Sequence, residues 1–474
     1  MSEGVDEPAA PASTPAQPVT AGSHEASEGR SRPDDAGGAA HEKGALVDAG
    51  EPVPGAARRR SVTVRRVIGL LGPGIVTGAA DDDPSGIATY SQTGAQFGYG
   101  QLWTAVWMLP MLAAVQEACA RIGHVTGKGL AAVIRSRYKL RVVRLLVTLL
   151  LVANIVNVGA DIGAVAASVH LVVPFPAAAI AVLFTAVLLA VEVRFSYRRY
   201  ARVLKWLTLS LLAYPVTAFL IAEPWARLLR ETFVPHVELS AGFFYVLTAV
   251  IGTTISPYMF FWQTSQEVEE LRSSRSTRSL RDVRFDNGVG MFNSQLIAWF
   301  IIVVAATVLH GGGVTTVKSA ADAARALRPL VKTFPHAGEV AQGLFAFGIT
   351  ALGMLAIPVL AGSAAYAVSE ARGWSEGLDL KLKQGRRFYG IIAAAMLIGL
   401  AFNLFGVNPV AALVFAAVVN AVVAVPLLWV VLRVSSDQAL MGEARSGWLS
   451  KTILALTLLG VAASAIATIV PHIR

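Results

Sequence analysis

The apolar residues of this chain of 474 residues fall in long blocks, and this constrains the fold more than any other feature. Many blocks hold about 20 residues, the length of helix that spans the hydrocarbon core of a bilayer. Hydrophobic residues make up 54% of the chain, charged residues only 15%, and the mean hydropathy is +0.57. Soluble proteins of this size are less apolar. We therefore predict an all-α polytopic protein of the cell membrane.

The blocks predict eleven transmembrane helices, of which the first and the sixth are broken. They are expected at residues 67–97, 101–122, 143–169, 174–193, 203–222, 243–267, 286–309, 341–369, 389–405, 408–432 and 449–470. Residues 1–57 are rich in Ala, Pro, Gly, Ser and Glu with almost no aromatic residues, which is typical of a disordered tail. The membrane domain would then comprise residues 58–474.

The Lys and Arg residues predict the orientation of these helices. Basic residues concentrate in the cytoplasmic loops of membrane proteins. If the N-terminus is inside, 30 of the 40 Lys and Arg residues fall in the predicted cytoplasmic segments. This predicts a cytoplasmic N-terminus and an external C-terminus. Topology then accounts for the net charge of +9, and no nucleic-acid partner is expected.

Two stretches break an apolar block. The first is "AADDDPSGIATY" at residues 79–90, and the second is "TTISPYMFF" at residues 253–261. They are five spans apart, which predicts a 5+5 arrangement of inverted repeats, with an extra helix after them. The repeats would cover about 67–222 and 243–432, and the extra helix 449–470. Paired broken helices in inverted halves are typical of the substrate site of a transporter. A plain proline kink is the alternative interpretation of Pro257.

The residues at the breaks favour a site for a hard cation. A helix that ends near Asp82 leaves carbonyl groups without partners at the negative end of its dipole. Asp83, directly before the proline, adds a full negative charge and is the first predicted ligand. The second break adds oxygens of Thr253 and Ser256, and oxygen ligands suit hard cations. Asp82 is expected to face a vestibule or to share protons.

A further carboxylate lies in the third predicted span. Asp161 shares a helix face with Asn154 and Asn157, at spacings of i, i+3 and i+7. Interhelical hydrogen bonds explain the two asparagines best. An intramembrane carboxylate is costly and usually functional, so Asp161 is predicted to relay protons or ions.

The breaks belong to longer stretches that resemble a known family. "GPGIVTGAADDDPSGIATYSQTGAQFGYGQLW" and "QEACARIGHVTGKGLA" resemble the first two spans of the Nramp family, the natural resistance-associated macrophage proteins. "VIGTTISPYMF" is similar to the family's sixth span. The resemblance implies proton-coupled transport of divalent metals and the inverted-repeat fold of the amino-acid/sodium symporter type. It also implies a divalent metal ion as substrate and a lipid bilayer as surroundings.

The sequence departs from the family at the positions that the resemblance implies bind metal. The family's first-span motif is Asp-Pro-Gly-Asn, in which the Asp and the Asn bind metal. Asp83 matches the Asp, but Gly86 takes the place of the Asn. The sixth-span motif is Ala-X-X-Met-Pro-His, and here Thr253, Ser256 and Tyr258 replace the Ala, the Met and the His. The thioether that helps to select manganese and iron is therefore missing, as is the proton-linked histidine.

The family's third span carries a carboxylate pair. Asp161 matches one member of the pair, and Ala164 takes the place of the other. The resemblance and the breaks together imply two sets of site residues. The predicted metal ligands are Asp83, Gly86, Thr253 and Ser256, and the predicted proton or gating residues are Asp82, Asp161 and Tyr258.

The predicted function is secondary transport of a divalent cation, Mn²⁺ or Mg²⁺ or both, linked to protons and working by alternating access. Without the Met, the site loses its discrimination against Mg²⁺. Two alternatives remain: a transporter of the same fold that couples H⁺ or Na⁺ to a non-metal solute, and a membrane sensor that transports nothing. The sequence has no HExxH motif, P-loop or nucleophile–base set, so we predict no enzymatic activity, catalytic residue, bound cofactor or ATPase subunit.

Overall fold

The computed structural model describes residues 73–194, 208–221, 223–273 and 279–469, and these residues form helices and their connections. The predicted disordered tail at 1–57 lies outside the described residues. So do residues 67–72 of the first predicted span, residues 203–207 and 222 of the fifth, and residue 470 of the last.

Nine helical stretches in the described residues are long and apolar enough to cross a membrane, and each matches a predicted span. They are α4 (Trp103–Thr126), α6 (Leu140–His170), α7 (Ala177–Arg194), α11 (Ala241–Thr254) with α12 (Pro257–Ser273), α13 (Leu280–Ala305) with the π-helical η2 (Ala306–His310), α15 (Ala337–Arg372), α16 (Arg386–Phe402) with η4 (Asn403–Phe405), α17 (Pro409–Ser435) and α19 (Trp448–Ile469). The structure therefore supports a multi-pass membrane protein.

Two further predicted spans are present as shorter pieces. The first is the pair α2 (Pro73–Asp81) and α3 (Pro84–Phe97), and the fifth appears as η1 (Thr208–Leu212) and α9 (Ala213–Leu220). Because the fifth is only partly described, the total of eleven spans and the inverted repeat stay predictions.

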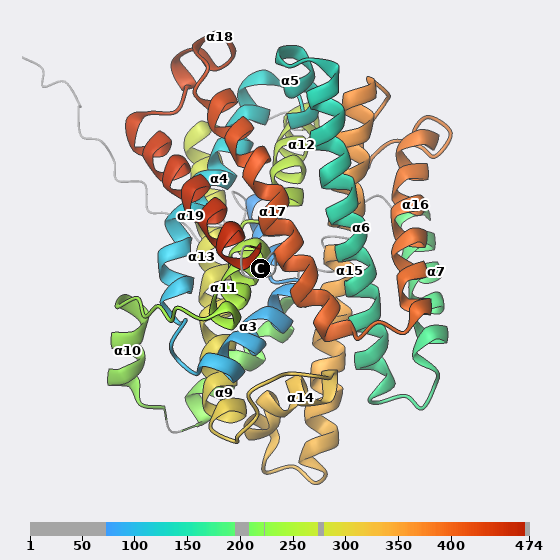
Figure 1. The fold of residues 1–474 in the computed structure, drawn as a ribbon. Coiled ribbons are helices and arrows are strands. Elements are labelled where there is room, and N and C mark those ends of the chain that lie inside the picture. The colour runs from blue at the N-terminus through green and yellow to red at the C-terminus, as the bar shows by residue number, and fades with distance from the viewer. Residues whose placement is uncertain (1–72, 195–207, 222, 274–278, 470–474) are drawn as a thin grey trace, which may run out of the picture. The chain divides into compact units, whose positions relative to one another are not determined.

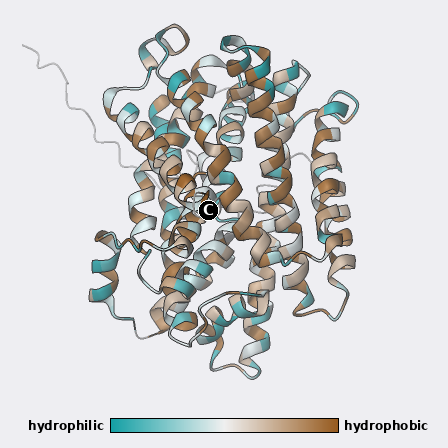
Figure 2. Ribbon diagram, in the orientation of Figure 1, coloured by the Kyte–Doolittle hydropathy of each residue, from teal (hydrophilic) through white to brown (hydrophobic). Residues whose placement is uncertain are grey.

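Several short helices in the connections were not predicted, because they contain no apolar block. They are α5 (Leu130–Arg137), α10 (Trp225–Phe233), α14 (Ala320–Ala324), η3 (Arg325–Val331), α18 (Gln438–Met441) and η5 (Gly442–Ala444). Figure 2 shows hydrophobic residues along the middle of the long helices, whereas hydrophilic residues gather in the connections at both ends. This distribution fits a bundle whose outer surface faces lipid.

Both predicted helix breaks are present. The last residue of α2 is Asp81, and α3 begins two residues after Asp82 at Pro84. In the second break α11 ends at Thr254 and α12 begins at Pro257. Each second half begins with a proline, which suits the first position of a helix because its missing N–H would have no partner there.

Small residues hold the broken helices against their neighbours. A Cβ atom added to Gly78 in α2 would collide with the backbone of Gly290 in α13, and one added to Gly94 in α3 would collide with that of Ile302. A Cβ atom on Gly252 in α11 would collide with the Ala417 carbonyl group in α17. Close backbone contact at small residues is how helices associate within membranes. The first break is thus fixed in position by α13 and the second by α17; α13 lies beside α3, and α17 lies beside α11 (Figure 1).

Candidate cation site at the two helix breaks

Asp83 occupies the first break as the N-cap of α3. Its Oδ1 atom accepts a hydrogen bond of 2.7 Å from the backbone N–H of Gly86, which is the standard bond of an N-cap carboxylate. Its Oδ2 atom lies 3.4 Å from the hydroxyl oxygen of Tyr258. The side chain is only 3% exposed. The carboxylate therefore caps one helix with one oxygen and turns the other toward α12.

Tyr258 links the two breaks. Its hydroxyl group donates to the Ala80 carbonyl oxygen at 3.0 Å and also reaches Asp83 Oδ2. Ala80 lies in the last turn of α2, where carbonyl groups have no partner within the helix. One hydroxyl proton thus faces two acceptors, one on each side of the first break.

Gly86 faces a narrow gap between the two breaks. A Cβ atom placed on Gly86 would lie 3.1 Å from the carbonyl oxygen of Asp81 and 3.6 Å from Thr253 Oγ1. The missing side chain therefore brings a carbonyl group of α2 and a hydroxyl group of α11 near one another. The structure brings Asp83, Gly86, Thr253 and Tyr258 together, as the sequence predicted for neighbouring breaks.

Ser256 lies in the same region but points back at its own helix. Its Oγ atom is 2.7 Å from the Gly252 carbonyl oxygen and 2.8 Å from that of Thr253. The hydroxyl group thus satisfies carbonyl groups at the end of α11. Its proton is thus directed at its own helix, and the lone pairs of the oxygen remain as acceptors.

The asparagines form the interhelical hydrogen bonds that were predicted for them. Asn154 in α6 donates to the Leu360 carbonyl group in α15 at 2.9 Å. The side-chain amides of Asn157 in α6 and Asn420 in α17 donate to one another, with hydrogen bonds of 2.8 and 3.2 Å. Asn420 also reaches Ser256 Oγ at 3.4 Å. This chain of bonds ties the second break to α17 and α6.

Asp81 and Asp82 face α13. The Ser294 hydroxyl group donates to Asp81 Oδ2 and lies 3.4 Å from Asp82 Oδ1. In the described part of the chain, Asp81 Oδ1 and Asp82 Oδ2 are buried without a hydrogen-bond partner. The three consecutive acids thus face two different helices, because Asp83 is turned toward α12. The role of Ser294 was not predicted from the sequence. The signal for it was the polar run Asn-Ser-Gln within the apolar block at 286–309.

Asp161 is fully buried in α6. Among the described residues, neither of its carboxylate oxygens has a hydrogen-bond partner. A buried carboxyl group without partners is costly, which is the physical ground for expecting a function.

The site residues of the second break are buried from solvent. Thr253, Ser256 and Tyr258 are 2%, 1% and 0% exposed. At one end of the bundle, Glu117 in α4 binds Arg284 in α13 at 2.9 Å. At the other end, the Tyr99 hydroxyl group lies 2.7 Å from Thr307 Oγ1 in η2.

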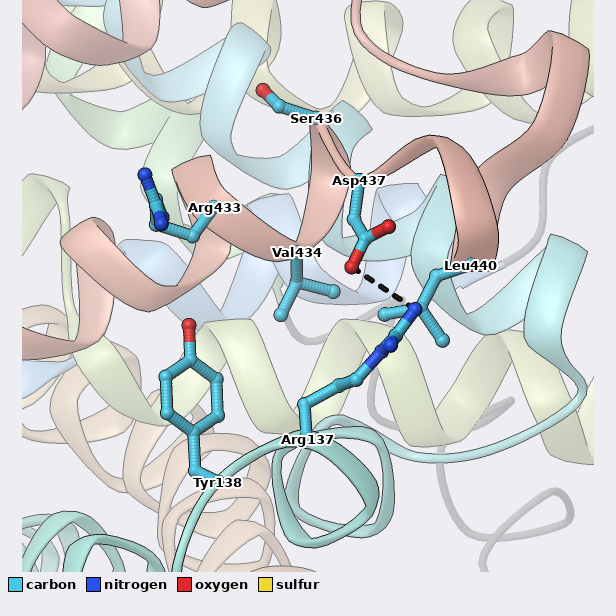
Figure 3. A pocket seen from close by; sticks show the side chains of 7 residues that line it. All are labelled: Arg137, Tyr138, Arg433, Val434, Ser436, Asp437 and Leu440. Carbon is cyan, nitrogen blue, oxygen red and sulfur yellow. Dashed lines mark ion pairs between the residues drawn. The ribbon is translucent and has the colours of Figure 1, made fainter.

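An open hollow of about 410 Å³ lies away from the breaks (Figure 3). It is lined by Arg137, Tyr138, Arg433, Val434, Ser436, Asp437 and Leu440. Arg137 pairs with Asp437 at 3.1 Å, which leaves the charge of Arg433 in excess. This hollow does not suit a metal cation.

Residues 74–471 match the Nramp family, described as natural resistance-associated macrophage protein-like. The chain is 29% identical over 302 residues to a protein of Ralstonia nicotianae named divalent metal cation transporter MntH. That match covers 61% of this chain and 66% of the relative, slightly less than two thirds of its length. The relative is named as a transporter, which agrees with the prediction that this chain is not an enzyme.

Solved structures show the same fold. A crystal structure of the Eremococcus coleocola manganese transporter, in complex with an aromatic bis-isothiourea substituted compound, aligns with a TM-score of 0.68 at 17% identity. The alignment covers 85% of this chain and 87% of that chain. A mutant of the same transporter aligns with a TM-score of 0.67 at 17% identity, over 85% and 86% of the two chains. The family match spans nearly all of the described residues, and the chain therefore belongs to the Nramp family.

Proposed function

We propose that this chain is a secondary transporter that binds a divalent cation at the two helix breaks and carries it across the membrane. The observation that carries the proposal is an imbalance of buried charge. The buried carboxylates at and near the breaks are Asp81, Asp82, Asp83 and Asp161. In the described part of the chain, Arg121 is the one buried Lys or Arg side chain, and it pairs with Glu117. Carboxylates buried without a counter-ion require a bound cation or a proton.

The ligand set favours a hard divalent cation. Asp83 Oδ2, the Ala80 carbonyl oxygen and the oxygens of Thr253 are all hard ligands, and the Ser256 hydroxyl oxygen is another. Mn²⁺ and Mg²⁺ both suit such a site, and the relatives are named as divalent metal and manganese transporters.

Alternating access and proton linkage complete the proposal. Because the site residues are buried, a cation reaches them only if one end of the bundle opens. The contact between Glu117 and Arg284 would open on one side, and the contact between Tyr99 and Thr307 on the other. The distribution of Lys and Arg favours a cytoplasmic location for the first side. Asp161 and Asp82 are the proposed carriers of a coupled proton.

Uptake into proteoliposomes tests the function. The purified chain should take up Mn²⁺ or Mg²⁺, and Asp83→Asn should abolish uptake while its thermal unfolding stays cooperative. Uptake of neither ion by the wild type, together with uptake of an organic solute driven by H⁺ or Na⁺, would show a transporter of the same fold for a non-metal substrate. No uptake of any solute would favour a sensor.

A further inference from the structure

We propose that the Tyr258 hydroxyl group occupies the position of the cation in the empty site and must leave before a cation binds. This inference rests on the proposed function, because it concerns the same site. It makes Tyr258 a residue that sets the affinity of the site, as distinct from a ligand.

The geometry places the hydroxyl group between two of the proposed cation ligands. Tyr258 is fully buried, and its hydroxyl oxygen lies 3.0 Å from the Ala80 carbonyl oxygen and 3.4 Å from Asp83 Oδ2. These two oxygens lie on opposite sides of the break between α2 and α3. A cation bound at this break would be drawn to the same oxygens. Both cannot be shared with a hydroxyl proton that points at them, because the proton and the cation carry charge of the same sign.

The backbone of Tyr258 is held in place by α15. Its backbone carbonyl group accepts a hydrogen bond of 2.7 Å from Ser363 Oγ in α15. Tyr258 is the second residue of α12. The hydroxyl group therefore leaves the break by a rotation of the side chain or by a shift of α12 relative to α2. Cation binding is thereby linked to a change at α12, one of the two halves of the second broken helix.

The inference predicts a direction of effect opposite to that of a ligand. If the hydroxyl oxygen binds the cation, removal of this oxygen weakens binding. If the hydroxyl group competes with the cation, its removal strengthens binding. The substitution then removes hydrogen bonds that stabilise only the cation-free state.

The test is calorimetric binding of Mn²⁺ to the purified full chain in detergent. Tyr258→Phe should bind Mn²⁺ about tenfold more tightly than the wild type, the effect expected when a hydrogen bond to a charged group no longer competes. The matched control is Tyr90→Phe. Tyr90 is also buried, and its hydroxyl group shares a hydrogen bond of 3.0 Å with Thr254 Oγ1. Among the described residues, no hydrogen bond joins this hydroxyl group to Ala80 or Asp83. This variant should stay within about twofold of the wild type.

The outcomes separate the inference from the proposed function. Equal or weaker Mn²⁺ binding by Tyr258→Phe, with clear binding by the wild type, overturns the inference and leaves the proposed function standing. No binding of Mn²⁺ or Mg²⁺ by either protein contradicts both.

A second measurement needs only the wild type, so it does not depend on the folding of a variant. The ultraviolet resonance Raman bands of tyrosine report the hydrogen bonds of the phenol group. Saturation with Mn²⁺ should change these bands, because Tyr258 loses its two acceptors. Unchanged bands in a protein that has bound Mn²⁺ overturn the inference.

Discussion

Asp83 Oδ1 lies 2.7 Å from the backbone nitrogen of Gly86, so the residue proposed to bind the cation also begins helix α3. The two roles use different oxygens of one carboxylate. Asn is as good an N-cap as Asp, whereas Ala is a poor one. This difference separates folding from cation binding.

Asp83→Asn and Asp83→Ala should therefore differ in stability although both lose cation binding. Asp83→Asn should unfold at a temperature no lower than that of the wild type without metal. Asp83→Ala should be less stable by about 1 kcal/mol, the usual cost of a lost N-cap. Differential scanning fluorimetry in detergent measures both. Equal stability of the two variants would show that the cap does not matter.

Ser256→Met should shift the selectivity of the site toward soft metals. The change removes a hydroxyl group that bonds the carbonyl oxygens of Gly252 and Thr253, and adds a thioether beside the break. Sulfur binds Cd²⁺ and Mn²⁺ better than Mg²⁺, which holds its water strongly. Competition between Cd²⁺ and Mg²⁺ in binding calorimetry checks this prediction.

The wild type should discriminate poorly between Mn²⁺ and Mg²⁺, and the double variant Ser256→Met with Gly86→Asn should shift further than Ser256→Met alone. If the wild type binds Cd²⁺ more tightly than Mn²⁺, or if neither variant shifts the preference, Ser256 does not lie beside the cation.

Asp161→Asn should alter the pH dependence of uptake more than the affinity for the cation. Asp161 is fully buried and, in the described residues, has no hydrogen bond to Asp83 or to any other group. The profile is obtained from initial uptake rates at pH values about half a unit apart, from about pH 5.5 to about pH 8, the range in which a relay would titrate. Asn154→Ala is the control, because it changes a neighbour on the same helix face whose amide bonds the Leu360 carbonyl group in α15 and not the break. An affinity loss of about tenfold with an unchanged profile would make Asp161 a ligand or a structural residue.

A loop at one end of the bundle should give the protein a pH-dependent stability that is separate from transport. The pKa of Glu376 is raised to about 7. Burial is the largest cause, the nearby Arg272 opposes it, and the nearby Glu269 adds to it. Because the folded protein binds this proton more tightly than the unfolded chain does, stability should fall as pH rises from about 4.5 to about 7, and then level off.

Glu376→Gln is neutral at every pH and should lack this fall. The melting temperature of the wild type should therefore drop relative to that of Glu376→Gln between about pH 5 and about pH 7. The matched control is Glu339→Gln, at a side chain that is 80% exposed. Parallel melting curves for the wild type and Glu376→Gln across this range would contradict the prediction.

The spans could be predicted because hydrophobic length determines which segments cross a bilayer. The first break could be predicted because Asp83 followed by Pro84 is the usual pattern of an N-cap residue and the first residue of a helix. The partners of the site residues could not. Tyr258 and Ala80 are 178 residues apart, and Ser294 and Asp81 are 213 apart, so their hydrogen bonds depend on packing that no local pattern encodes. The inward turn of Ser256 likewise depends on which carbonyl groups the end of α11 leaves free.

The position of a bound metal shows whether the cation binds at the two helix breaks. An anomalous difference map of the wild type with Mn²⁺ should show one peak between the Asp83 carboxylate, the Ala80 carbonyl oxygen and Thr253, and the Tyr258 hydroxyl group should have moved away from it. The peak should be absent in Asp83→Asn. A peak elsewhere in the protein, or a peak at the break that survives in Asp83→Asn, would contradict cation binding by Asp83 at the break.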